Sequence, residues 1–192
     1  MAIKKIYKIN EFLTLKLEDR KTKIYVKNNE FRTCKFLLLV DPNGVIGGNI
    51  NSIDEAAEKY DDILEGDEFL PEEFAISPEQ EFWAHCSNLQ AWAENKYNIN
   101  LIHSNLAFPL LVKLIKVGDL KARICFEEQI FRAFLELNFS IIKSILYRDL
   151  LDLLDEEKLK SLKIELKEKN PDLAAFFFPV FLRIHSDSDL EE

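Results

Sequence analysis

The chain has 192 residues, of which 47% are hydrophobic, so it is long enough for one sizeable core and too short for two independent enzymatic domains. Its fifteen phenylalanines and five glycines favour a well-packed interior that is rich in regular elements. The formal charge of −9 argues against a general nucleic-acid binder, because affinity for a phosphate backbone comes chiefly from Lys and Arg. We therefore expect no nucleic-acid partner.

The charges are unevenly distributed. Residues 1–35 hold ten Lys or Arg against four Asp or Glu, whereas residues 54–81 hold twelve acidic residues and a single base, Lys59. Such an acidic block is most often a solvated helix face. The alternative is a docking surface for a basic protein partner, because opposite charges steer association.

The three cysteines are Cys34, Cys86 and Cys125, an odd number of widely spaced residues in apolar surroundings. No hydrophobic leader precedes Ile3, so we expect a protein of the reducing cytoplasm. The longest apolar runs, such as 36–40, are much shorter than the roughly 20 residues that a membrane span requires. We expect no membrane partner.

The first 48 residues are typical of a small β module. Apolar and polar residues alternate over 12–17 and again over 23–27, with a short polar turn between the two runs. A third run, 36–40, is apolar at every position and would be a buried strand. We expect two or three antiparallel strands within about residues 7–40, followed by a flexible loop in the glycine-rich segment DPNGVIGGN.

Residues 49–185 carry helix-start and helix-stop signals and predict a helical domain. The expected helices cover 53–64, 77–97, a segment that opens near 103–105, a segment capped by Asp119, and the ranges 140–154 and 156–169. We predict an α+β fold that is predominantly α, in which the β module packs on a helical bundle or short α-solenoid of five to seven helices. The molecule would be one compact unit, with residues 186–192 as a polar tail.

Near the C-terminus lies a very apolar segment, residues 174–184. So much apolar surface must be buried against the helical domain or against another molecule. The segment therefore suggests a homo-oligomer.

A helix that starts at Ser77 would place a polar stripe beside an apolar stripe. The polar stripe consists of Glu81, His85, Asn88, Trp92 and Asn95, and the apolar stripe of Phe82, Cys86, Leu89 and Ala93. One interpretation is a closed hydrogen-bonded network covered by the tryptophan. The other is a ligand-binding or catalytic site.

A catalytic cysteine needs a base and an orienting group within hydrogen-bonding reach. Cys86, His103 and Asn88 supply these residue types, although a thiol in the middle of a helix lacks the usual activation. The alternative that stays open is a small-molecule-binding or hydrolytic domain that uses these three residues together with Glu81 and His85.

A metal site is less favoured. Glu81 and His85 contribute at most two ligands from one helical turn, and the others would have to come from His103 and from Cys86 or Glu94. No metal-binding or cofactor-binding motif occurs in the sequence. We expect neither a metal nor a cofactor.

Several segments, taken in order, carry a family resemblance: YKINEFLTLKLEDRKTKIYVKNNEF, CKFLLL, SIDEAAEKYD, EFWAHCSNLQAWAENKYN, LIHSNLAFPLLVKLIKVGD and LLDLLDEEKLKSLK. Together they resemble an uncharacterised archaeal domain that is commonly found N-terminal to leucine-rich repeats. The resemblance covers most of residues 7–165 and implies an association with repeat-type interaction proteins, with no established activity. No leucine-rich repeat follows Pro171.

The resemblance also gives weight to six polar residues: His85, Cys86, Asn88, His103, Ser104 and Asn105. Their expected use is structural, with Ser104 or Asn105 capping the helix that begins there. The expected function is that of a cytoplasmic, non-catalytic protein–protein interaction or adaptor domain. The candidate binding residues are Glu81, His85, Asn88, Trp92, His103 and Asn105.

Overall fold

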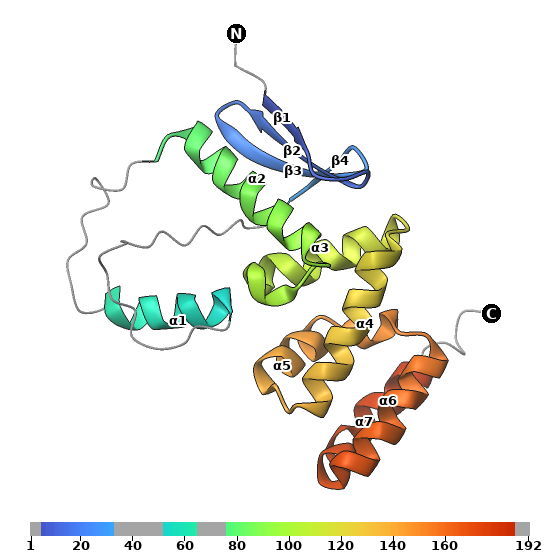
Figure 1. Ribbon diagram of the computed structural model, residues 1–192. Helices are drawn as coiled ribbons and strands as arrows, with labels where there is room; N and C mark the ends of the chain where they lie inside the picture. Colours follow the sequence, from blue (N-terminus) through green and yellow to red (C-terminus); the bar gives the residue numbers. More distant parts are fainter. Residues whose placement is uncertain (1–4, 33–51, 65–75, 187–192) are drawn as a thin grey trace. The chain divides into compact units, whose positions relative to one another are not determined.

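The structure is a computed structural model that describes residues 5–32, 52–64 and 76–186. Within these ranges the chain is mostly helical and has one antiparallel sheet (Figure 1), so the predicted α+β, predominantly α class is confirmed. The chain divides into two compact units, Met1–Cys125 and Phe126–Glu192. The division lies inside helix α4 (Leu120–Leu135), whereas the sequence suggested a boundary near residue 48.

The sheet has four described strands in the order β1-β2-β3-β4, each antiparallel to the next. The two predicted hairpin strands are confirmed as β2 (Leu13–Glu18) and β3 (Lys21–Val26). The flanking strands β1 (Lys5–Lys8) and β4 (Asn29–Phe31) were not predicted, because strands of four and three residues are too short to show a clear alternation. The strand predicted at 36–40 lies outside the described residues.

Two-residue turns connect β2 to β3 and β3 to β4. All four turn residues have positive φ, with 50° and 63° at Asp19 and Arg20 and 42° and 69° at Lys27 and Asn28. Two consecutive left-handed residues are the requirement of the type I′ turn, whose twist matches that of the strands it joins. The sheet is therefore a tight meander.

Helix α2 (Pro78–Glu94) covers one face of this sheet (Figure 1). The inward face of the sheet consists of alternate residues of β2 and β3 that are 0–4% exposed, such as Leu13, Leu15 and Ile24. α2 begins with the predicted capping box, in which Ser77 and Gln80 each accept the other's backbone N–H. It ends at Glu94, although the sequence predicted an end near residue 97. Residues 96 and 97 cannot continue the helix because their φ values are positive, 57° and 61°.

The other helices are α1 (Ile53–Leu64), the short 3-10 helix η2 (Ile99–Leu101), α3 (Ser104–Lys116), α4, α5 (Phe139–Tyr147), the 3-10 helix η3 (Leu150–Leu153), α6 (Glu156–Lys169) and α7 (Pro171–Ser186). Among them, α1, α3, α4 and α6 match predicted helices, α5 covers the first part of a predicted one, and η2 and α7 were not predicted. Asp119 and Asp155 cap α4 and α6 as expected. The single helix expected over 140–154 is wrong: Asp149 has φ 50°, which separates α5 from η3.

In the second unit, α6 and α7 lie side by side (Figure 1). Leu162 and Leu166 of α6 are fully buried, and Phe177 of α7 is 4% exposed and contacts Phe134 edge-on at 5.3 Å between ring centroids. Phe176, the residue before, is 74% exposed. The apolar segment 174–184 is therefore part of a helix that buries one of these rings and leaves the other in solvent.

Candidate functional site

The predicted polar stripe of α2 is divided between the core and the surface. His85 and Trp92 are 3% and 0% exposed, because they lie on the face of α2 that packs against the sheet. Glu81 is half-buried at the rim of this face, and Asn88 is exposed. The stripe therefore does not form one surface, and Asn88 points away from the buried members.

Within the buried part, the Nε2 atom of His85 lies 3.6 Å from an Oε1 atom of Glu81, one helical turn earlier. This distance is longer than a normal hydrogen bond. His85 thus occupies a core position with a carboxylate at its edge. A structural role for this pair stays a prediction.

His103 is the N-cap residue of α3, where its Nδ1 atom accepts a hydrogen bond of 3.1 Å from the backbone N–H of Asn105. The expectation that Ser104 or Asn105 is the cap is wrong, because α3 already begins at Ser104. A cap must lie outside the helix while its side chain reaches the second or third helical N–H. The imidazole ring meets this requirement here.

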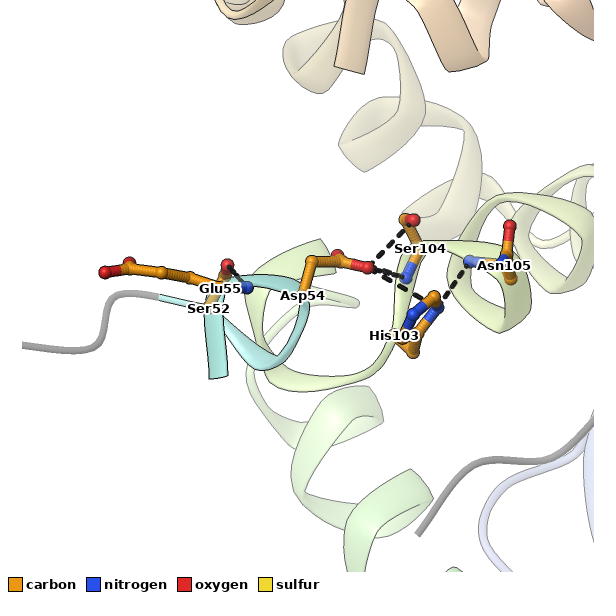
Figure 2. Close-up of polar contacts among 6 residues, drawn as sticks. All are labelled: Ser52, Asp54, Glu55, His103, Ser104 and Asn105. Carbon is orange, nitrogen blue, oxygen red and sulfur yellow. Dashed lines mark hydrogen bonds and ion pairs between the residues drawn. The ribbon is translucent and has the colours of Figure 1, made fainter. Parts of the chain in front are cut away.

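Asp54, in the first turn of α1, binds the N-terminus of α3 (Figure 2). Its carboxylate accepts hydrogen bonds from the backbone N–H of Ser104 at 3.1 and 3.2 Å and from the Ser104 hydroxyl at 3.0 Å, and it lies 3.4 Å from Nδ1 of His103. A helix N-terminus attracts a carboxylate, because its first N–H groups have no partner within the helix. This member of the predicted acidic docking block therefore holds α1 to α3, and residues 65–75 of that block lie outside the described part of the chain.

The proposed catalytic thiol, Cys86, is 1% exposed. Burial raises the pKa of the Cys86 thiol to about 12, so at neutral pH it is fully protonated. A nucleophilic cysteine requires the thiolate and hence a lowered pKa. This environment argues against Cys86 as a nucleophile.

A buried polar network that the sequence did not predict is centred on Tyr97. The Tyr97 hydroxyl donates a hydrogen bond of 2.5 Å to Asp119 and accepts one of 3.0 Å from the Asn10 amide. The second carboxylate oxygen of Asp119 caps α4 by accepting the N–H of Lys121 at 2.9 Å, while the Cys125 thiol donates to the Tyr97 carbonyl at 3.2 Å. Burial, followed by the hydrogen bond to Asp119, raises the pKa of Tyr97.

This network joins the β1–β2 connection, the turn after α2 and the start of α4. Only Asp119 gave a signal in the sequence, as a helix cap, because a short acidic side chain after Gly118 is typical of a new helix start. Asn10 and Tyr97 stand in no periodic pattern that could have linked them to it.

A groove of about 390 Å³ opens between β1 and α2. Tyr7 of β1 lines it from one side, and the other side is a single stripe of α2 that includes Trp83, Cys86, Ser87, Gln90 and Glu94. The volume lies in the range of sites that bind small ligands or side chains. Of the predicted site residues, Cys86 lines this groove, whereas His85, Asn88 and His103 do not.

One end of the groove is aromatic. Trp83 is 49% exposed, and its ring meets that of Tyr7 edge-on, with 5.8 Å between centroids and 81° between planes. Lys5 lies next to this end, with its Nζ atom 5.8 Å from the Trp83 centroid and 3.1 Å from a carboxylate oxygen of Glu79. A half-exposed tryptophan beside a tyrosine offers a large apolar surface to a partner.

The other end of the groove is acidic. The Tyr7 hydroxyl donates a hydrogen bond to Oε1 of Gln90, and the Gln90 amide donates to a carboxylate oxygen of Glu94 at 2.7 Å. Glu94 is exposed in the last turn of α2, which contains no basic residue, and Lys96 in the following turn is not among the lining residues. The partial negative charge at a helix C-terminus adds to that of the carboxylate.

Across the described ranges 5–32, 52–64 and 76–186, no group of three or more His, Cys, Asp or Glu side chains is placed to hold a metal ion. The helices within these ranges are all too short or too polar to cross a membrane. Comparisons of the chain with protein-family models, with curated proteins and with solved structures find no match. The resemblance to the archaeal domain therefore stays a prediction.

Proposed function

We propose that this protein is a non-catalytic protein-interaction domain that holds a basic segment of a partner protein in the groove between β1 and α2. The observation that carries the proposal is the composition of the groove, which places the exposed ring of Trp83 and the carboxylate of Glu94 on one stripe of one helix. Tryptophan, tyrosine and arginine dominate the binding energy of protein interfaces, so an exposed tryptophan in a groove is a natural anchor.

The charge of the groove favours a cationic partner. α2 contains three glutamates and neither Lys nor Arg, and Glu94 is the charged residue that lines the groove. An arginine or lysine side chain would gain from the carboxylate and from the face of the indole ring, which attracts cations. The aliphatic part of such a side chain would cover the aromatic wall.

Two of the residues considered for catalysis lie in environments that do not activate them. The thiol that lines the groove, Cys86, is held neutral by burial, and Nδ1 of His103 caps α3 by accepting the backbone N–H of Asn105. The resemblance to a domain that precedes leucine-rich repeats agrees with an adaptor role. The three scattered cysteines favour a cytoplasmic setting.

The test is a selection of binders from a display library of random seven-residue segments, with the full-length protein as bait. We expect the selected segments to be enriched in Lys and Arg. Their synthetic peptides should bind with an affinity that falls with rising salt, because exposed charges are screened. Titration with the intrinsic fluorescence of Trp83 measures the affinity, since this tryptophan is half-exposed whereas Trp92 is buried.

Two substitutions with matched controls locate the binding site. Trp83→Ala should weaken binding at least about tenfold, whereas Tyr147→Ala, which removes an aromatic ring that is 85% exposed in the second unit, should not. Glu94→Gln should weaken binding of basic peptides, whereas Glu168→Gln, an exposed carboxylate in the last turn of α6, should not. For these variants binding is followed by calorimetry.

Three results would overturn the proposal. They are enrichment of acidic or uncharged segments in the selection, no enrichment at all, and binding that survives Trp83→Ala.

A further inference from the structure

Among the described strands, β1 forms an edge of the sheet, and this edge lies beside the groove. β1 pairs with β2 on one side and with none of the described strands on the other. In the hairpin, the backbone N–H of Ile9 donates to the carbonyl of Leu13 at 3.0 Å, which continues the register Tyr7↔Leu15 and Lys5↔Leu17. Hydrogen-bonded pairs alternate along an antiparallel ladder.

The same alternation decides where the other backbone groups of β1 point. Residues 5, 7 and 9 exchange hydrogen bonds with β2, so the backbone N–H and C=O groups of Ile6 and Lys8 point away from β2. These four groups form the edge that a further strand would recognise. Their orientation does not depend on any side chain.

α2 lies beside β1. Two side-chain contacts join these elements, Lys5 with Glu79 and Tyr7 with Gln90, and a third joins Asn10 to Tyr97 beyond the ends of both. The lining stripe from Trp83 to Glu94 extends over about 16 Å at 1.5 Å per helical residue. An extended chain covers that length with about five residues.

We infer that the partner segment binds as an added β-strand on the edge of β1, with alternate side chains directed toward α2 and a basic side chain paired with Glu94. This inference rests on the proposed function and specifies how the basic segment is held. Main-chain hydrogen bonds to Ile6 and Lys8 supply affinity that does not depend on sequence. The groove supplies the sequence preference, because every second side chain of the segment faces the lining of α2.

An extended occupant fits these features better than a helix. A helix forms its own backbone hydrogen bonds and is 10–12 Å wide, so it would leave the edge of β1 unused. An extended segment satisfies its own backbone groups only by pairing with an edge. The groove, which has a strand edge beside it, therefore fits an extended segment.

The first experiment measures amide hydrogen exchange by NMR, with the full-length protein and a capped five-residue peptide derived from the selected basic segments. Saturating peptide should slow exchange of the Ile6 and Lys8 amides at least about tenfold, because they acquire hydrogen-bond partners. The Tyr7 amide, which already faces Leu15, is the internal control and should change little. Unchanged exchange at both residues would overturn the inference.

The second experiment changes the peptide. N-methylation at alternate backbone nitrogens should abolish binding in one alternating set and leave it within about twofold in the other, since only one set faces β1. Replacing the basic residue of the peptide by norleucine should weaken binding to the wild-type protein but not to the Glu94→Gln variant. Basic peptides that bind without any sensitivity to N-methylation would refute strand addition alone and leave the proposed function standing. A selection without basic segments would refute both.

Discussion

Tyr97 shows how a single side chain can hold several segments together. Its backbone lies in the left-handed region, with φ 61°, which is uncommon for residues other than glycine and asparagine. Its ring packs on that of Trp92 with 4.7 Å between centroids, and its hydroxyl binds Asp119. The hydrogen bond and the ring contact offset the cost of this conformation.

Replacement of Tyr97 by Phe should therefore destabilise the first unit by about 1–3 kcal/mol, because the buried carboxylate of Asp119 loses a donor. Urea unfolding followed by tryptophan fluorescence measures this change, since both tryptophans lie in the first unit. Tyr147→Phe is the matched control and should have almost no effect, as Tyr147 is 85% exposed. Equal effects of the two substitutions would contradict a structural role of the network.

The neutral Cys86 thiol predicts slow alkylation. With a pKa of about 12, roughly one molecule in ten thousand carries the thiolate at pH 8. Iodoacetamide should label Cys86 in the native protein at least about a hundredfold more slowly than in urea-unfolded protein. Mass spectrometry of the peptide that contains Cys86 resolves this site from the other cysteines. Rapid labelling of the native protein would instead support the cysteine-based hydrolytic alternative.

The same thiol predicts a loss of stability at alkaline pH. In the unfolded chain the Cys86 thiol ionises near its ordinary pKa of 9.0, whereas burial raises this pKa to about 12 in the folded protein. Between these values the unfolded state binds fewer protons, so the free energy of unfolding falls as pH rises, by at most about 1.4 kcal/mol per pH unit for this group. Urea unfolding from pH 8 to 11 should show a shallower fall for Cys86→Ala. Parallel curves for the two proteins would contradict the assignment.

At the level of whole elements, the attachment of α1 depends on Asp54. Asp54→Ala removes the carboxylate that binds the N-terminus of α3 and should cost about 1 kcal/mol or more. Hydrogen exchange with mass spectrometry should show reduced protection of α1, while α2 keeps its protection. The control is Glu58→Ala, an exposed residue of the same helix, which should leave the protection unchanged.

The helix starts that the sequence predicted share a chemical feature. Ser77, Asp119 and Asp155 are short side chains whose oxygen reaches the backbone N–H groups of the first turn, so residue type and position are sufficient to predict the cap. His103 was missed because imidazole is an unusual cap. The Ser104 that follows it is a better capping residue by type, but Asp54 engages it.

Sequence patterns could not predict the candidate groove. Periodicity placed Trp83 and Glu94 on the same helix, but it could not show which strand lies beside them. The pairing with Tyr7 depends on long-range folding, and β1 itself is too short to be recognised. For the same reason the sequence grouped His85 with Asn88, although the packing of α2 on the sheet buries the first and exposes the second.

At the level of the whole molecule, each of the two compact units contains buried apolar residues. The first contains the sheet with α2 and α3, where Phe82 and Leu110 are fully buried. The second contains α6 and α7, where Leu162 is fully buried. We therefore predict that a substitution in one unit weakens that unit selectively.

Leu162→Ala should destabilise the second unit by about 2–5 kcal/mol, because it removes buried methyl groups and leaves a cavity. Far-UV circular dichroism, which reports helices of both units, should then show an earlier transition in urea, while tryptophan fluorescence, which reports the first unit, keeps its midpoint. Leu110→Ala is the matched control and should shift the fluorescence midpoint. If both probes shift together in both variants, the units unfold as one cooperative block, and their buried residues do not act as independent sources of stability.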